Sequence, residues 1–130
     1  MNEIFGGNSM TVLQKSLDAL WLRQKVVSNN IANVDTPGYK SQTVQFESLL
    51  NDALQGSTGQ TEDQLNAKLQ NLNPQVQQDT STTMRADGNN VDIDSENVSL
   101  ARTQIEYLYA TRMMSSEISR MKYAITEGKG

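Results

Sequence analysis

The chain has 130 residues, a formal net charge of −4 and an apolar content of 36%, and only 5% of its residues are aromatic. This length fits one modest domain, but so few large apolar side chains predict an elongated molecule rather than a compact one. Cysteine and histidine are both absent, which excludes disulfides, thiolate metal sites and the commonest general base.

The first predicted element is a long helix that ends near residue 34. Apolar residues recur in it at alternating spacings of three and four, which is the heptad pattern of a coiled-coil seam. These seam residues are Met10, Leu13, Leu17, Leu20, Val27, Ile31 and Val34. Thr11 with Gln14 matches a capping box, and Asn8 or Ser9 is an alternative cap one turn earlier. Trp21 lies beside the seam and is predicted to be a packing or interface anchor.

This helix ends in an unusual run of amides followed by a turn, SNNIANVDTPGYK, residues 28–40. Pro37-Gly38 fits the central positions of a type II turn, because glycine accepts the positive φ that this turn requires. Asn33 is predicted to take the left-handed conformation that ends many helices. The amides weaken a helix, so we expect them to make polar contacts with neighbouring helices. The predicted signature turn comprises Asn29, Asn30, Asn33, Asp35, Thr36, Pro37, Gly38 and Tyr39.

The middle segment, residues 35–94, carries most of the acidity. It has nine acidic and three basic residues, net −6, whereas the segments on either side are each net +1. Apolar spacing predicts short helices around residues 46–54 and 63–72, and residues 73–83 are predicted to be loop. Residues 87–96, DGNNVDIDSE, resemble a calcium loop but lack the glycine and glutamate that an EF-hand requires, so no metal is expected there. We expect the insert to be loosely ordered.

The last predicted element is a helix over residues 95–126, capped by Asp94 or Ser95. Its apolar stripe has two halves joined through Thr111 by three-residue steps, which overwind a coiled coil locally. The stripe consists of Val98, Ala101, Ile105, Leu108, Met114, Ile118, Met121 and Ile125. The simplest way to bury it is to pack it against the first helix, antiparallel. The basic residues of the two long helices are predicted to form solvated faces; they include Arg23, Lys25, Arg102, Arg112, Arg120 and Lys122.

Together these elements predict an elongated, all-α fold. Residues 1–34 and 95–130 pair as a coiled-coil hairpin, and residues 35–94 form a turn and a flexible acidic insert with loops and short strands. A two-helix hairpin leaves apolar surface uncovered, so helices from other copies are expected to complete the core. The uncovered residues are Tyr107, Tyr109, Met113 and Met114.

The signature SNNIANVDTPGYK, placed after a heptad helix, resembles that of the flagellar axial proteins, the rod, hook and hook-associated subunits of the bacterial flagellum. The length is most similar to that of the small proximal rod subunits. The resemblance implies a structural subunit, without catalytic residues, cofactor or metal, whose terminal helices build the axial tube around the export channel and transmit torque. The residues expected to pack in that assembly are Met10, Leu13, Leu17, Leu20, Trp21, Val27, Ile31, Ile105, Leu108, Met114, Ile118, Met121 and Ile125.

The resemblance also implies partners and a location. The expected partners are other copies, neighbouring rod proteins, and components of the membrane ring, rod base and export gate, with no nucleic acid and no small-molecule substrate. The expected location is the periplasmic rod of the basal body, reached by type III export without a cleaved signal peptide. Two other hypotheses remain open at this point: a cytosolic coiled-coil adaptor or export chaperone, which would form a discrete dimer, and an enzyme, for which the sequence offers no catalytic constellation.

Overall fold

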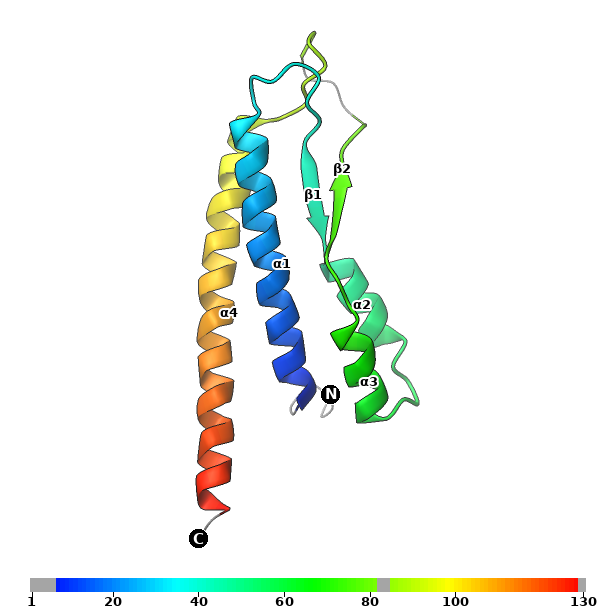
Figure 1. The fold of residues 1–130 in the computed structure, drawn as a ribbon, viewed down its shortest axis with the longest axis vertical. Coiled ribbons are helices and arrows are strands. Elements are labelled where there is room, and N and C mark those ends of the chain that lie inside the picture. The colour runs from blue at the N-terminus through cyan, green and yellow to red at the C-terminus, as the bar shows by residue number, and fades with distance from the viewer. Residues whose placement is uncertain (1–6, 82–84, 129–130) are drawn as a thin grey trace.

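The computed structural model describes residues 7–81 and 85–128, and over these ranges it contains four helices and one two-stranded sheet. The elements are α1 (Gly7–Ala32), β1 (Gln42–Gln45), α2 (Glu47–Gln55), α3 (Glu62–Gln70), β2 (Gln75–Gln78) and α4 (Ile93–Glu127). They form an elongated molecule in which α1 lies between α4 on one side and the other elements on the opposite side (Figure 1). The predicted mostly helical fold, with its long first and last helices packed together, is confirmed.

The two long helices run antiparallel but differ in length. α4 has 35 residues and α1 has 26, so at 1.5 Å per residue α4 is about 13 Å longer. The extra length projects past the beginning of α1 (Figure 1). None of the helices in the described ranges combines the length and apolar character that crossing a bilayer demands.

The face of α4 that packs inside the chain is built from small side chains. Thr103 and Ala110 are its buried residues, and the Thr103 hydroxyl donates to the Ser99 carbonyl 2.7 Å away, one turn earlier in the helix. Small side chains at the contact allow the axes of two helices to approach closely. On α1, the predicted seam residues Leu20 and Val27 are buried.

The prediction that the apolar stripe of α4 packs on α1 is wrong for most of its length. Ile105 is 70% exposed, and along the second half exposure rises from 41% at Ile118 to 63% at Ile125. Because the stripe steps by threes through Thr111, its two halves lie on nearly opposite sides of a helix with 3.6 residues per turn. The predicted packing residues that stay exposed are Trp21, Ile105, Leu108, Ile118, Met121 and Ile125.

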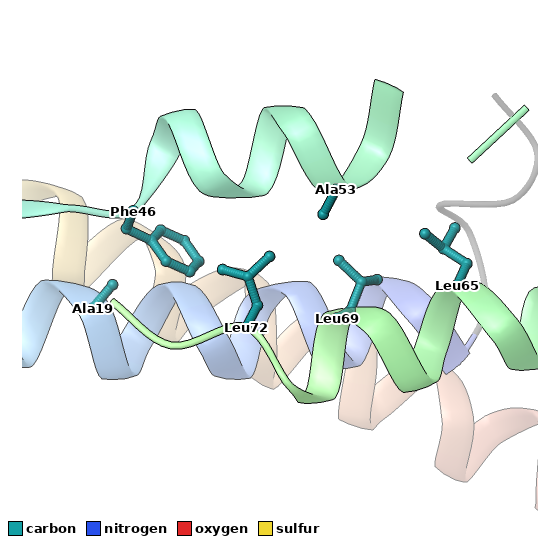
Figure 2. Close-up of a cluster of buried hydrophobic side chains, with 6 residues drawn as sticks. All are labelled: Ala19, Phe46, Ala53, Leu65, Leu69 and Leu72. Atoms are coloured by element: carbon teal, nitrogen blue, oxygen red, sulfur yellow. The ribbon is translucent and has the colours of Figure 1, made fainter. Parts of the chain in front are cut away.

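The insert is more ordered than predicted, because it has a core of its own against α1. Strands β1 and β2 pair antiparallel with Val44 opposite Val76. Helices α2 and α3 then bring apolar side chains onto Ala19 of α1 (Figure 2). The buried residues of this core are Ala19, Phe46, Ala53, Leu65, Leu69 and Leu72. The loop predicted for residues 73–83 is wrong at β2, since backbone pairing with β1 makes that segment a strand.

Two predicted helix caps are also wrong. Thr11 lies inside α1, where its hydroxyl donates to the side-chain oxygen of Asn66 on α3 at 2.8 Å. Asp92 caps α4, because its extended backbone lets the carboxylate accept from the backbone N–H groups of Asp94 and Ser95.

Candidate functional site

Two sequence motifs that lie some fifty residues apart meet at the end of the molecule where α1 stops and α4 begins (Figure 1). One is the signature turn, residues 33–39, and the other is the loop over residues 85–91. The backbone N–H of Gly38 donates to the carbonyl of Asp87 at 2.9 Å, and that of Asn90 donates to the carbonyl of Tyr39 at 3.4 Å. We call these two joined segments, with the asparagines that bind them, the clasp.

Asn89 is the central side chain of the clasp and is fully buried. Its Nδ2 donates to the carbonyls of Asn33 at 2.9 Å and Thr36 at 2.8 Å. Its Oδ1 accepts from the backbone N–H of Val91 at 2.8 Å. One amide therefore satisfies three backbone groups from both segments and holds the end of α1 against the loop before α4.

Asn90 performs the same task for the two strands. Its Oδ1 accepts from the backbone N–H of Ser41 at 2.7 Å, just before β1, and its Nδ2 donates to the carbonyl of Asp79 at 2.8 Å, just after β2. The Asp79 N–H also donates to the Ser41 carbonyl at 2.8 Å. The strand ends are thus fixed to the loop that leads into α4.

Asn30 joins α1 to β1 and is also fully buried. Its Oδ1 accepts from the Gln42 N–H at 2.9 Å and from the Tyr39 hydroxyl at 3.0 Å, and its Nδ2 donates to the Gln42 carbonyl at 2.8 Å. We predicted that these amides would contact neighbouring helices. That interpretation is wrong for Asn30, whose buried amide bonds only within the chain, whereas Asn33 bonds to the Asn29 carbonyl and stays partly exposed.

The backbone of the signature turn agrees with one prediction and corrects another. Gly38 has a φ of 72°, as the Pro37-Gly38 turn requires, and the Tyr39 N–H donates to the Thr36 carbonyl at 3.2 Å. Asn33 does not have a positive φ. Its carbonyl is instead satisfied by Asn89, so the helix needs no left-handed residue to end.

We expect Gly38→Val to destabilise the clasp and impair swimming, and Gly38→Asn to do much less. Nothing lies within 4 Å of a Cβ placed at Gly38, so space is available there. The cost comes from the positive φ, about 1 to 2 kcal/mol for most residues and less for asparagine. Thermal unfolding and swimming in soft agar measure both variants. Equal behaviour of Val and Asn would contradict the backbone explanation.

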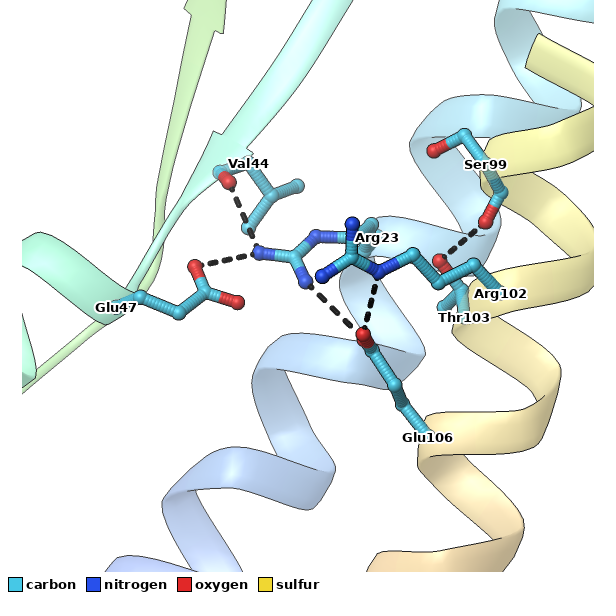
Figure 3. A network of polar contacts seen from close by, with 7 residues as sticks. All are labelled: Arg23, Val44, Glu47, Ser99, Arg102, Thr103 and Glu106. Carbon is cyan, nitrogen blue, oxygen red and sulfur yellow. Dashed lines mark hydrogen bonds and ion pairs between the residues drawn. The ribbon is translucent and has the colours of Figure 1, made fainter. Parts of the chain in front are cut away.

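A second polar group, centred on Arg23, joins α1 to β1, α2 and α4 (Figure 3). The Nη2 of Arg23 donates to the Val44 carbonyl at 3.3 Å and to Glu47 Oε2 at 2.7 Å. The Nη1 of Arg23 lies 3.7 Å from Glu106 Oε2. Glu106 also accepts from Arg102 Nε at 2.8 Å. Arg23 was predicted to lie on a solvated face, but its side chain is only 18% exposed and links α1 to β1, α2 and α4.

The two acidic side chains near these groups have pKa values that shift in opposite directions. Partial burial alone would raise the pKa of Glu47, but the hydrogen bond and charge of Arg23 bring it below its usual value. Burial raises the pKa of Glu96, the nearby charge of Asp92 adds to this, and a hydrogen bond with Asn30 opposes it only in part. Glu96 is therefore ionised at a free-energy cost in the folded chain.

We expect Glu96→Gln to raise the thermal midpoint at pH 7 and to change it little near pH 4. A carboxyl whose pKa is raised by folding stabilises the fold at low pH, and this contribution is lost as pH rises from its unfolded pKa through its folded pKa. Glutamine keeps the shape without the charge. Glu47→Gln is the opposite control. A carboxyl whose pKa is lowered by folding stabilises the fold at pH values above its unfolded pKa, and this stabilisation is lost on acidification. An unchanged pH profile for Glu96→Gln contradicts the burial argument.

The remaining feature is the exposed apolar surface of α4. One stripe lies on the side of α4 away from α1, and the other lies where α4 projects past the beginning of α1 (Figure 1). Trp21 of α1 is also exposed, with Lys25 Nζ 5.6 Å from the centre of its ring. Within residues 7–81 and 85–128, no three acidic side chains are grouped closely enough to hold a metal ion. The arrangement offers surfaces for protein contact and a rigid joint that orients them.

Comparison with known proteins assigns the family. Residues 10–40 match the model of the family described as "Flagella basal body rod protein". The flagellar basal body rod protein FlgB of Bacillus subtilis is 33% identical over 119 residues, which cover 90% of this chain and 92% of that protein. The chain belongs to the FlgB family of flagellar basal body rod proteins. FlgB of Borreliella burgdorferi is 36% identical over 82% of this chain and 87% of its own length, and FlgB of Escherichia coli is 29% identical over 88% and 91%.

The family assignment agrees with the sequence analysis. The resemblance stated from SNNIANVDTPGYK is confirmed, and the matched residues 10–40 contain most of α1 and the signature-turn half of the clasp. Proteins of this family are structural components of the flagellar basal body rod. The loop over residues 85–91 lies outside the matched segment, so the structure is what reveals it as the other half of the clasp.

Proposed function

We propose that the chain is a structural subunit of the proximal rod of the flagellar basal body and that it assembles through α1 and α4. The observation that carries this proposal is the extent of the match: FlgB of Bacillus subtilis aligns over about nine-tenths of both chains. Because the alignment covers nearly the full length of both proteins, it supports the same role for the whole chain, rather than for one shared segment.

The surface of α4 supports assembly through the terminal helices. Monomeric soluble proteins rarely leave long apolar rows uncovered, yet large apolar side chains are exposed from Val98 to Ile125. Packing against helices of other subunits would bury them. Apart from Trp21, the predicted assembly residues on α1 are less exposed, because α1 lies between α4 and the insert (Figure 1).

The joints described above suit a rod that transmits torque. Asn30, Asn89 and Asn90 fix the insert and both long helices at the clasp, and Arg23 fixes them again further along α1. A subunit held at two separate points resists bending of the insert relative to the helices. Contacts with the membrane ring, rod base and export gate, and export without signal cleavage, remain proposals that rest on the family resemblance.

The test is mass spectrometry of hook–basal bodies purified from the source cells. We expect the chain there, stoichiometric with other rod components and with its N-terminal residues intact. Recovery only from the cytosol, as a discrete dimer in sedimentation, would favour the alternative of a coiled-coil adaptor or export chaperone. Deletion of the gene should abolish swimming, and the wild-type gene supplied in trans should restore it.

A further inference from the structure

We propose that copies of this chain associate head to tail through two different stripes of α4. The outward stripe, Val98, Ala101 and Ile105, packs against the overhang stripe, Ile118, Met121 and Ile125, of the next copy. This deepens the proposed rod function by naming the surfaces that join copies, and it takes its biological setting from that function.

The outward stripe lies on the side of α4 that faces away from α1. Thr103 is buried and marks the packed face. Ala101 and Ile105 each stand two residues from Thr103, which places them about 160° away around the helix. Val98 and Ile105 are both exposed. Arg102 borders the stripe but pairs with Glu106 on its own helix at 2.8 Å, and Val98 and Ile105 stay 69% and 70% exposed beside it.

The overhang stripe lies on the opposite side, in line with the packed face. Met121 follows Thr103 by eighteen residues, about five full turns at 3.6 residues per turn. It continues the face that packs on α1, but α4 is nine residues longer than α1, 35 against 26, and projects beyond it (Figure 1). The side chains of Ile118, Met121 and Ile125 are accordingly exposed.

The two stripes fit each other in spacing. Each has apolar residues separated by three and then four positions, so a shift of twenty residues pairs Val98 with Ile118 and Ile105 with Ile125. This shift corresponds to about 30 Å along the helix. The helices must run parallel, because an antiparallel neighbour would run into α1. The parallel register also places Arg112 of one copy about 8 Å past the end of the other helix at Glu127, a terminus that favours a cation.

Because the two stripes differ, the contact is heterologous and does not close. Each added copy still offers one free stripe at either end, which is how head-to-tail chains grow. Three side chains on each partner bury much less than the roughly 1,200 Å² of a stable pairwise interface. We therefore expect monomers in dilute solution and association at high local concentration or alongside further contacts.

Disulfide cross-linking tests this cleanly, since the chain has no cysteine of its own. Ile105→Cys and Ile125→Cys are purified separately as full chains with tags of different size, mixed at high concentration and oxidised. We expect a heterodimer in the mixture and little dimer from either variant alone. The double variant should give a ladder of oligomers. Ser116→Cys, exposed on the other side of the helix from Ile118, replaces Ile125→Cys as the matched control and should lose the heterodimer.

The outcomes separate this proposal from the rod assignment. Homodimers of Ile105→Cys that exceed the heterodimer would show a symmetric contact and overturn the proposal. Equal cross-linking with Ser116→Cys, or none in any mixture, would overturn it as well. None of these results bears on the rod function, which predicts that the chain is found in purified basal bodies in every case. Circular dichroism of each variant checks that the exposed substitutions leave the helices intact.

Discussion

Asn89→Ala should lower the free energy of unfolding by about 2 to 3 kcal/mol, because it removes one side chain that satisfies three backbone groups. The N–H of Val91 loses its partner, and the carbonyls of Asn33 and Thr36 each lose one of two donors. The two carbonyls lie near the surface, where water can replace the lost hydrogen bonds in part. The loss of stability should therefore lie at the low end of what three unsatisfied backbone groups would cost. For a chain of this size the midpoint should fall by roughly 10 °C.

The matched control is Asn97→Ala, an exposed asparagine on the first turns of α4. Alanine is the better helix former there, so the control should be neutral or slightly stabilising. Hydrogen exchange adds a local readout: amides of residues 36–42 and 87–91 should exchange faster in Asn89→Ala, while those in the middle of α1 stay protected. If Asn89→Ala melts like its control, the clasp does not stabilise the fold.

The elements whose apolar periodicity is long were predicted well from the sequence. The heptad spacing from Met10 to Ile31 predicted α1, and the spacing around Leu50 and Leu69 predicted α2 and α3. Periodicity shows that residues share a face of a helix, but it does not show what covers that face. The stripe of α4 was therefore recognised as apolar but assigned to the wrong neighbour.

The features that depend on long-range pairing were not predictable from residue patterns. The Pro37-Gly38 pair predicted the first of the two turns, and Gly38 does have a positive φ, as does Gly88 in the second turn. Nothing in the sequence indicated that Asn89 would bind the first turn across more than fifty positions. Strand β2 was missed for a related reason: QVQQ is exposed throughout and has no apolar alternation, so its partner β1 alone makes it a strand.

Arg23 shows a further limit of sequence reading. A basic residue on an amphipathic helix is usually solvated, and the sequence offers no sign of its partners. Burial beside β1 and α4 appears only in the fold, where Val44, Glu47 and Glu106 surround the guanidinium (Figure 3). A charged group this enclosed is stable only because each neighbour accepts from it or carries the opposite charge.

Leu69→Ala should destabilise the chain by about 3 kcal/mol, the second large effect we expect. Leu69 is 1% exposed and lies among Phe46, Leu65 and Leu72 in the core that seats the insert on α1 (Figure 2). That core is small, so a cavity there removes a large share of the packing between α2, α3 and α1. We expect α2 and α3 to detach before the long helices separate.

Leu108→Ala is the matched control, since the same side chain is removed from a position that is 54% exposed. Without a cavity its effect on monomer stability should stay within about 0.5 kcal/mol. Limited proteolysis separates local from global loss: Leu69→Ala should be cut first in the segment that links α2 to α3, residues 56–61, while α1 and α4 resist. Simultaneous cleavage throughout the chain would mean that the insert and the helix pair form one cooperative unit, in which the clasp couples both halves of the subunit.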